Sequence, residues 1–443
     1  MPLDCSTSIA HQRRAHAIIP GAAHTYAKGD DQFPEFLPPV IRRGHGCHVT
    51  DLDGNTFIEY GSGLRAITLG HGVPEICDAA YAAMRDGTNF ARPSVLELQA
   101  AEKMLELVPN ADMVKFAKHG SDCTTAAVKL ARHHTGRGKI AICRDDPFYS
   151  VDDWFIATTP MDGGIPGAVR DETVLFPFND LPACERLFAE PDHDIAAIML
   201  EGQRGAVPED GFLHKLRDLA HAHGALFILD ETIAGFRLAN AGAQQLHDIE
   251  PDLSTFGKAM ANGFSVSALC GKRQYMAAGG IDHDGDRTFL LSTTHGAESH
   301  GLAAFMATVD IYQRRDVPGE LAQIGERLCA AFDAASRSAG TGEFVHTAGH
   351  PANAVFVTRG PDGQGGNQPF RTLFMQEFLK NGVLAPSLVV NTAHGEGDGP
   401  DDVIDATANA AHAACSVYRK ALDEGVEKYL EGRSVKPVFR RRC

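Results

Sequence analysis

One lysine and one aspartate, 28 positions apart, are the residues of this sequence best suited to chemistry. The run Ala225–Leu229 is apolar and ends in Asp230 and Glu231. Further along, the stretch 252–263 presents Lys258 among small and apolar residues. A buried strand that ends in a carboxylate, followed by an isolated lysine, is the pairing that pyridoxal 5′-phosphate (PLP) needs. The lysine would form a Schiff base, and the aspartate would pair with the protonated pyridine nitrogen, which keeps the ring able to accept electrons.

Both residues also have a plainer interpretation. Most lysines lie at protein surfaces, and an aspartate after a strand often caps the following turn. For Lys258, the small neighbours Gly257 and Ala259 and the absence of nearby charge weaken the surface interpretation. For Asp230 both interpretations stay open. If the strand continues past Asp230, Thr232 lies on the same side of the chain and could touch the ring.

A second group of residues could bind phosphate at the start of a helix. Gly120 and Ser121 precede apolar residues at helical spacing, which predicts a helix over 122–134 with Ser121 as its N-cap. Free backbone amides, a glycine and a hydroxyl at a helix start form a phosphate cradle, although an ordinary capped helix has the same pattern. The hydroxyl-rich run 292–300 precedes a predicted helix over 301–312 and could bind phosphate in the same way.

An aromatic pair could stack on a flat cofactor ring. Phe148 and Tyr149 follow the predicted strand 139–143, so that one of them could lie at the carboxyl end of the sheet. Packing in the core is the alternative role for either side chain.

These segments lie where predicted strands and helices alternate, which is typical of an α/β fold with a mostly parallel sheet covered by helices. The predicted strands are 113–117, 139–143, 195–200 and 225–229. The predicted helices are 96–107, 122–134, 213–223 and 301–312. We expect residues 73–310 to form a large domain. Residues 1–72, with a hairpin turn at Asp53–Asn55, and residues 311–443 would form the two parts of a smaller α+β domain.

Composition excludes several classes of protein. The 443 residues carry a net charge of −16, which disfavours nucleic-acid binding. No apolar run is long enough to span a membrane, and the first residues do not resemble a secretion signal. The ten cysteines show no CxxC pair, so they predict reduced thiols in a cytoplasmic protein and no metal site.

In this order, the segments resemble the class III family of PLP-dependent aminotransferases, and within it the branch of glutamate-1-semialdehyde aminomutase and amino-sugar aminotransferases. The resemblance covers nearly the whole chain and implies the PLP-dependent transferase fold of type I, with the large domain binding PLP. The matching segments are Pro20-Gly21, Asp51–Gly54, Leu69–His71, Gly120–Asp122, Asp230-Glu231, Gly235–Arg237, Phe256–Lys258, Ala385–Ser387 and Ala393-His394.

The resemblance implies a role for each matching residue. Lys258 would hold the cofactor and move a proton, and Asp230 would be the partner of the pyridine nitrogen. The other cofactor-binding residues would be Gly120, Ser121, Asp122, Phe148, Tyr149, Glu201, Thr232 and Thr294. Phe148 matches the stacking aromatic more closely than Tyr149, and Thr232 matches a valine on the opposite face of the ring. Thr294 matches a threonine that reaches the phosphate of the neighbouring subunit, which implies a homodimer with shared active sites.

Three departures from the family pattern concern the substrate. Glu-Pro-Val-x-Gly is replaced by Glu201–Gly205, Tyr-His-Gly by Phe148–Ser150, and the aminomutase's tryptophan by Leu64. The stretches 20–31 and 152–154 look more like the amino-sugar branch, including enzymes of aminoglycoside biosynthesis. The residues expected near the substrate are His24, Tyr26, Leu64, Arg65 and Arg204. The alternative receivers of a donor carboxylate are Arg65, Arg92 and Arg204.

Together these features predict a ping-pong transamination. An amino acid, expected to be glutamate, would convert PLP to pyridoxamine 5′-phosphate, which would then aminate the carbonyl of a sugar or aminoglycoside-type molecule. The alternatives are an intramolecular aminomutase of the glutamate-1-semialdehyde type, or epimerisation or elimination on an amino sugar. Retention of Lys258 and Asp230 disfavours a non-catalytic PLP-binding protein. The absence of a GxGxxG motif after a first strand disfavours a nicotinamide dehydrogenase.

Overall fold

The chain divides into two compact units, each of which combines stretches that are distant in sequence. The computed structural model describes residues 3–36, 39–192, 194–396 and 402–440. The small unit comprises Met1–Val73 and Glu320–Phe439, and the large unit comprises Pro74–Gly319 with Arg440. The residues expected to bind the cofactor therefore all belong to the large unit.

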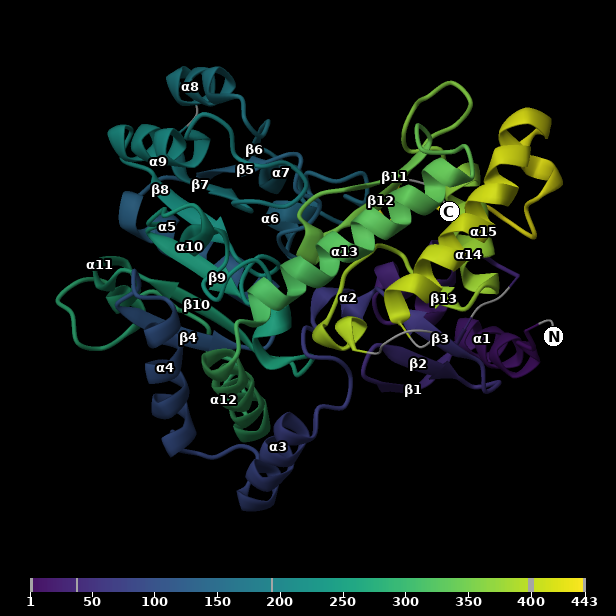
Figure 1. Ribbon diagram of the computed structural model, residues 1–443. Helices are drawn as coiled ribbons and strands as arrows, with labels where there is room; N and C mark the ends of the chain where they lie inside the picture. The colour runs from purple at the N-terminus through teal and green to yellow at the C-terminus, as the bar shows by residue number, and fades with distance from the viewer. Residues whose placement is uncertain (1–2, 37–38, 193, 397–401, 441–443) are drawn as a thin grey trace. The chain divides into compact units, whose positions relative to one another are not determined.

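A seven-stranded sheet forms the centre of the large unit (Figure 1). Its strand order is β4-β10-β9-β8-β7-β5-β6. The strands are β4 Met113–Ala117, β5 Lys139–Cys143, β6 Thr173–Phe176, β7 Ile195–Leu200, β8 Leu226–Asp230, β9 Leu253–Phe256 and β10 Ser267–Gly271. β10 is antiparallel to both β4 and β9, whereas the other neighbouring pairs are parallel. The predicted mostly parallel sheet is confirmed.

Helices cover this sheet. They are α3 Pro74–Asp86, α4 Val95–Leu107, α5 Gly120–Thr135, α6 Asp153–Ile156, α7 Gly167–Arg170, α8 Leu181–Ala189, α9 Phe212–Ala222, α10 Ala243–Leu246, α11 Arg273–Met276 and α12 Ser299–Arg314. α5 packs against β7, β9 and β10, while α8 and α9 lie together beside the strands (Figure 1). Because crossover helices bury both faces of the parallel strands, β7 is apolar along its length, β8 is apolar as far as Leu229, and both strands are wholly buried.

The core beside α9 shows how the sequence pattern produces this packing. Leu213 and Leu216 are spaced to face one side of the helix, and both are fully buried. They belong to one apolar cluster with Ile198 of β7 and with Phe227 and Leu229 of β8. This packing fixes the position of β8 in the sheet, and therefore the place where the strand ends in Asp230.

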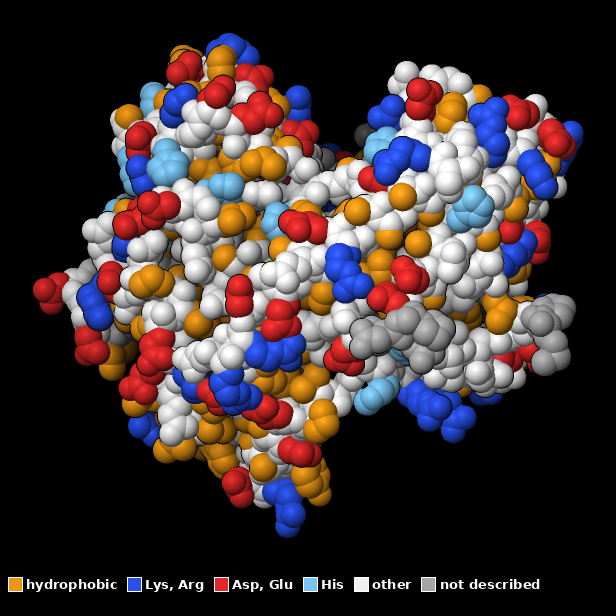
Figure 2. Space-filling view, viewed as in Figure 1, with side chains coloured by type: hydrophobic (Ala, Val, Ile, Leu, Met, Phe, Trp, Pro, Cys, Tyr) orange, Lys and Arg blue, Asp and Glu red, His pale blue; other side chains and the backbone are white. Residues whose placement is uncertain are grey.

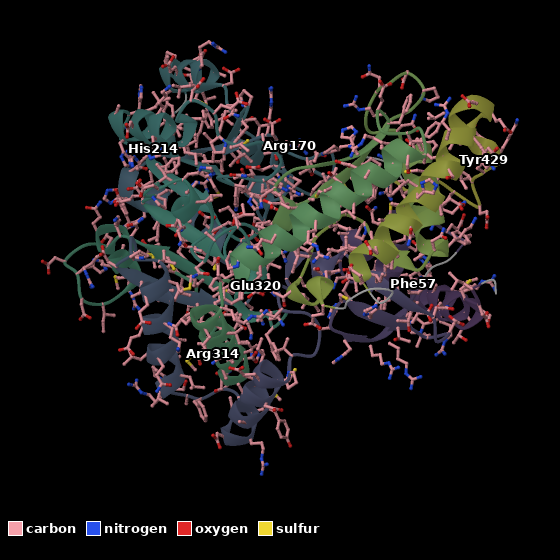
Figure 3. The ribbon with its side chains drawn as sticks, viewed as in Figure 1. Phe57, Arg170, His214, Arg314, Glu320 and Tyr429 are labelled. Atoms are coloured by element: carbon pink, nitrogen blue, oxygen red, sulfur yellow. The ribbon has the colours of Figure 1, made fainter. Side chains whose placement is uncertain are left out.

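The small unit contains a four-stranded sheet of order β1-β2-β3-β13 and a two-stranded pair, β11 with β12. Its strands are β1 Ile41–His45, β2 His48–Asp51, β3 Thr56–Glu59, β11 Val345–Ala348, β12 Val355–Thr358 and β13 Val383–Leu384. Its helices are α1 Ser6–Ile18, α2 Ser62–Arg65, α14 Gln368–Lys380 and α15 Val403–Glu424, with α13 Val317–Ser338 beginning in the large unit. The predicted hairpin is confirmed, since β2 and β3 pair antiparallel. Phe57 of β3 lies in a core cluster of this unit (Figure 3).

Three further observations concern membrane spans, metal sites and disulfide bonds. Within the described ranges, no helix is both long and apolar enough to cross a membrane. The same part of the chain has no group of three or more His, Cys, Asp or Glu residues that could hold a metal ion. All nine cysteines that the structure describes are free thiols.

Candidate active site

Asp230 lies at the carboxyl end of β8 with its carboxylate fixed in place. It is paired in register with Thr255 of β9, whose hydroxyl donates to Asp230 Oδ1 over 2.9 Å. The backbone N–H of Thr232 donates to the same oxygen, also over 2.9 Å. Asp230 is only 4% exposed. A carboxylate at the carboxyl end of a parallel strand lies where open α/β sheets bind their ligands.

Thr232 reaches this place through a turn. β8 ends at Asp230 and the chain turns from Thr232 onward, so the condition under which Thr232 was expected to lie on the same side as Asp230, a continuing strand, is not met. The physical reason lies in Glu231, which is fully buried and accepts the backbone N–H groups of Ala243 over 2.8 Å and Gln244 over 2.7 Å. These bonds bend the chain away from the sheet, and burial raises the pKa of Glu231 to about 8.

Lys258 follows β9 after one intervening residue and is half-buried. Its φ of 43° lies in the left-handed region, which a non-glycine residue rarely adopts and which is frequent at functional sites. Gly257 before it allows a close approach. A Cβ there would lie 3.2 Å from Thr232 Cγ2 and 3.9 Å from the Cα of Gly120. The end of β9, the turn after β8 and the start of α5 therefore meet beside Lys258.

The helix α5 begins at Gly120, two residues earlier than predicted, and the expected N-cap role of Ser121 is wrong. His119 is the N-cap residue, because Asp122 Oδ2 accepts its backbone N–H over 3.0 Å. This carboxylate extends the helix backward, so Ser121 lies inside the first turn. The Ser121 hydroxyl instead accepts the backbone N–H of Val151 over 3.1 Å. It thereby ties the loop after β5 to the start of α5.

Phe148 and Tyr149 have different surroundings. Phe148 is 40% exposed and contacts Phe155 edge to face, with ring centroids 5.5 Å apart. Tyr149 is 2% exposed, and its hydroxyl donates to Asp146 Oδ2 over 2.6 Å. Burial on this scale leaves the Tyr149 ring little room to receive a ligand. The geometry therefore favours Phe148 as the stacking aromatic, as the sequence does.

Glu201 introduces a buried carboxyl group just after β7. Its Oε2 atom has no hydrogen-bond partner among the described residues, and Oε1 lies 3.7 Å from Arg204 Nη1. Burial raises the pKa of Glu201 to about 8, against the lowering effects of Arg204 and Lys258. Burial also raises the pKa of the neighbouring Asp146 to about 6. Burial therefore favours the protonated form of Glu201.

Both departures from the family pattern after Glu201, at Gly202 and Gln203, have a packing explanation. A Cβ at Gly202 would lie 2.7 Å from the Cβ of Ala243 in α10, so the proline of the family pattern would not fit there. Gln203 is buried, and its Oε1 lies 2.7 Å from His247 Nε2. Arg204 alone turns toward Glu201. Arg204 stands at the variable position of the pattern, and it is the residue of this segment that bears on the site.

The cluster beside Lys258 in the large unit does not include the other residues expected near the substrate, nor Thr294, which was expected near the phosphate. His24 and Tyr26 lie in the small unit with exposed side chains. Leu64 and Arg65 also belong to the small unit. Arg92, in the large unit, is exposed in the loop between α3 and α4. Thr294 also belongs to the large unit, where it is exposed and precedes α12.

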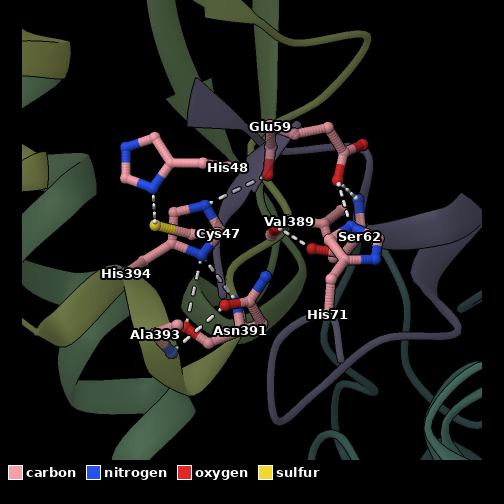
Figure 4. A network of polar contacts seen from close by, with 9 residues as sticks. All are labelled: Cys47, His48, Glu59, Ser62, His71, Val389, Asn391, Ala393 and His394. Atoms are coloured by element: carbon pink, nitrogen blue, oxygen red, sulfur yellow. Dashed lines mark hydrogen bonds and ion pairs between the residues drawn. The ribbon is translucent and has the colours of Figure 1, made fainter. Parts of the chain in front are cut away.

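Leu64 and Arg65 belong to a left-handed turn that is held from several sides (Figure 4). Ser62, Leu64 and Arg65 have φ values of 43°, 60° and 74°. Figure 4 shows the Glu59 carboxylate beside the turn, where Oε2 accepts the backbone N–H of Ser62 over 2.9 Å. The Ser62 hydroxyl donates to the Val389 carbonyl over 2.8 Å. Such conformations cost of order 1–3 kcal/mol each and persist only where the surroundings over-determine them.

The cluster in the large unit fits PLP. The backbone amides at the start of α5 suit a phosphate, and Asp230 suits a protonated ring nitrogen. A Cβ at Gly120 would lie 3.0 Å from Thr232 Cγ2, so only glycine leaves the approach open. The Thr232 hydroxyl is buried without a hydrogen-bond partner among the described residues, and it could pair with a bound ligand. The fold and this site define a PLP-dependent enzyme of fold type I.

Comparison with known sequences identifies the family. The family described as aminotransferase class-III matches residues 26–385. A glutamate-1-semialdehyde 2,1-aminomutase from Nitratidesulfovibrio vulgaris (strain DP4) is 34% identical over 409 residues, covering 87% of this chain and 95% of that protein. A 3-aminobutyryl-CoA aminotransferase from Cloacimonas acidaminovorans (strain Evry) is 30% identical, covering 86% and 90%. The chain belongs to the class III aminotransferase family, and it is a PLP-dependent enzyme.

Solved structures agree with this assignment. The FumI protein of Sphingopyxis sp. MTA144, solved in a PLP form, is 27% identical with a TM-score of 0.81, covering 94% of this chain and 97% of that one. A β-phenylalanine aminotransferase from Variovorax paradoxus shares the fold, with a TM-score of 0.78 at 23% identity, covering 94% of each chain. The predicted fold, enzyme class and cofactor are confirmed. The amino-sugar branch stays a prediction.

Gly120→Ala is expected to weaken PLP binding about 10-fold, because the new methyl group would crowd Thr232 at a cost of about 1–3 kcal/mol. Titration of the apoenzyme with PLP measures the effect. Gly138→Ala is the matched control, since a Cβ there meets nothing within 4 Å. Adding Thr232→Ser, which removes Cγ2, should restore part of the affinity. Equal affinity in the two alanine variants would contradict the crowding argument.

Proposed function

We propose that this enzyme transfers an amino group from an amino-acid donor, such as glutamate, to the carbonyl of a sugar or aminoglycoside-type molecule. The observation that carries the aminotransferase part is the meeting of Lys258, Asp230 and the start of α5 in one cluster. The cofactor would be bound at that cluster, with its phosphate at Gly120 and Ser121 and its ring against Phe148. The unpaired thiols support a location in the cytoplasm.

The residues of the cluster have separate tasks in this proposal. Bound PLP supplies an electron-accepting ring, which stabilises the negative charge left when the donor's α-carbon loses a proton. The Asp230 carboxylate, held by the Thr232 amide and the Thr255 hydroxyl, keeps a positive charge on the ring nitrogen. Lys258 Nζ takes the proton from the donor's α-carbon. Thr232 and Phe148 would hold the cofactor ring between them.

Arg204 is the arginine best supported as the receiver of the donor carboxylate. Its side chain is 25% exposed and its guanidinium lies near Glu201, whereas Arg92 is fully on the surface. Because the nearest Glu201 oxygen lies 3.7 Å from Arg204 Nη1 and burial favours the protonated form of Glu201, Arg204 is not held by a close ion pair and can bind an incoming carboxylate through two hydrogen bonds. Arg65 remains the alternative in the small unit.

An acidic loop supports a cationic acceptor. Asp145, Asp152 and Asp153 are exposed on either side of Phe148, and the chain carries a net charge of −16. Negative charge at the rim of a site attracts cations and repels dicarboxylates. An amino sugar with several ammonium groups has the complementary charge. The same charge argues against a small dicarboxylate as the only substrate.

A homodimer is part of the proposal. Figure 2 shows hydrophobic side chains gathered in the lower part of the large unit, around α3 and α12. The exposed large apolar side chains of this region include Tyr81, Met84, Phe90, Val95 and Leu98. A contiguous apolar surface of this kind supports association with a second copy of the chain. Thr294 would then bind the phosphate of the partner's cofactor.

The relatives named glutamate-1-semialdehyde aminomutase support a second candidate, an intramolecular aminomutase with one substrate and no separate donor. A donor and acceptor screen separates the two. With an amino-acid donor alone, transamination predicts a shift of the cofactor absorbance to that of pyridoxamine phosphate and release of the 2-oxo acid, detected by mass spectrometry. An amino-sugar ketone should then restore the first spectrum. No conversion by any donor, with isomerisation of a single substrate, would favour the aminomutase.

A further inference from the structure

Hydrogen bonds hold the backbone of the loop that precedes α12, and side chains of this loop are exposed. Residues 292–295, Ser-Thr-Thr-His, are all exposed. Asn89 Nδ2 donates to the Thr294 carbonyl over 2.9 Å, and the Ser299 N–H donates to the Thr88 carbonyl over 3.0 Å. Leu291, at the start of the loop, has a φ of 47°. A hydroxyl-rich loop held in this way is suited to binding a ligand that lies outside its own subunit.

Glu298 anchors the other end of the loop through ion pairs. Its Oε2 lies 2.7 Å from Lys118 Nζ, and both side chains are less than one fifth exposed, at 17% for Lys118 and 18% for Glu298. Oε1 lies 2.9 Å from His295 Nδ1, and Oε2 lies 3.6 Å from His300 Nε2. The hydrogen bond from Lys118 is the main cause that lowers the pKa of Glu298. The carboxylate therefore stays charged at neutral pH.

Two glycines allow the loop to approach the end of β4. A Cβ at Gly301 would lie 3.0 Å from Val266 Cγ2 and 3.5 Å from Lys118 Nζ. A Cβ at Gly296 would lie 3.4 Å from the carbonyl oxygen of Phe116. The loop therefore packs directly on the segment that carries Lys118.

Lys118 is itself fixed to the sheet, two residues before the start of α5. Its Nζ donates to the Ser265 carbonyl over 3.1 Å, and its own carbonyl accepts the Ser265 hydroxyl over 2.9 Å. The next carbonyl, of His119, accepts the Ser267 hydroxyl over 2.8 Å. Lys118 thus links two segments, the start of α5 and the loop that presents Thr294.

We propose that the Lys118–Glu298 ion pair is a positioning device, which holds Thr294 ready for the phosphate of PLP bound in a second copy of this chain. This inference rests on the dimer with shared sites in the proposed function. Its physical basis is preorganisation, because a loop that is already ordered loses less conformational entropy when its hydroxyl binds the phosphate. Lys118 and Glu298 act through Thr294 and touch no substrate.

Affinity for the cofactor with and without its phosphate tests the proposal. Lys118→Met and Glu298→Gln should each weaken binding of PLP to the apoenzyme about 10-fold and leave binding of pyridoxal, which lacks the phosphate, unchanged. The double variant should be little weaker than either single one, since both changes break one interaction. Lys118→Arg, which preserves the pair, should bind PLP almost normally. Asp162→Asn, which breaks the surface pair with Arg170, is the control (Figure 3).

Hybrid dimers locate the effect. In one hybrid, the subunit with Glu298→Gln keeps Lys258 and its partner carries Lys258→Ala. The visible absorbance of the lysine-bound cofactor then reports a site completed by an intact loop, and PLP affinity should be normal. In the other hybrid, Glu298→Gln and Lys258→Ala are in the same subunit. The reporting site is then completed by the altered loop, and PLP affinity should fall about 10-fold.

The outcomes separate this inference from the proposed function. If Thr294→Ala weakens PLP binding while Lys118→Met and Glu298→Gln do not, the positioning role is refuted and the shared site stands. Equal loss for PLP and pyridoxal would refute it too, because the pair would then only stabilise the fold. Weakening in the first hybrid alone would place the effect within one subunit and overturn the inference. If Thr294→Ala has no effect, the shared site itself fails.

Discussion

Lys258→Ala is expected to abolish the visible absorbance of the lysine-bound cofactor and to lower turnover by at least about 10³-fold. The change removes both the covalent link to the cofactor and the base that takes the proton from the donor's α-carbon, and a positioned general base alone contributes about 10²–10⁴-fold. Absorbance spectra of the purified enzyme and single-turnover conversion of the cofactor by a donor measure the two losses.

Asp230 and the start of α5 are untouched in this variant, so it should still bind PLP and pyridoxamine phosphate without a covalent link. Lys272→Ala is the control, since Lys272 lies in the same unit and pairs only loosely with Glu250, at 3.6 Å. It should keep the wild-type spectrum and rate. Normal turnover by Lys258→Ala would show that the wrong lysine has been assigned.

Asp230→Asn is expected to lower the rate of donor conversion about 10²- to 10³-fold. The amide keeps the shape of the side chain and can still accept from the Thr232 amide and the Thr255 hydroxyl. It loses the negative charge, however, and breaking a buried charge pair costs about 3–5 kcal/mol. Without that charge the ring nitrogen gives up its proton, and the negative charge on the α-carbon is no longer stabilised.

The measurement is the single-turnover rate at saturating donor, compared with the affinity for PLP. Asp252→Asn is the matched control. Asp252 is also a buried aspartate beside β8, and it accepts the Phe227 N–H over 2.8 Å. Its loss should lower stability and leave the rate per folded enzyme near the wild-type value. A rate for Asp230→Asn within about threefold of the control would contradict the assigned role.

The parts of the fold that depend on strong local patterns were predictable from the sequence. Buried parallel strands appear as continuous apolar runs, so β8 and the carboxylate at its end stand out from the order of residue types alone. β10, with the short sequence Ser267–Gly271, lacks that signal, and its antiparallel direction depends on pairing with strands distant in sequence. Asp230 could therefore be placed at the end of a strand, although β9, which precedes Lys258, and β10 could not be predicted.

The errors around the site come from interactions across the chain. Ser121 has a good N-cap side chain, but the carboxylate of Asp122 reaches His119 and starts the helix earlier. Thr232 would lie on the same side as Asp230 only if the strand continued, but the buried Glu231 turns the chain there. The protonation of Glu201 depends on its burial, which no local pattern records. In each case a long-range contact or burial overrides a local preference.

The left-handed turn at Ser62–Arg65 has a consequence for protein engineering. Its conformation is supported by hydrogen bonds from the backbone and side chain of Ser62 to Glu59 and Val389, and neither bond involves the side chain of Leu64. The shape of the turn and the identity of residue 64 are therefore separable. A library randomised at position 64, with Glu59 and Ser62 retained, would vary one candidate selectivity position while the backbone scaffold stays constant.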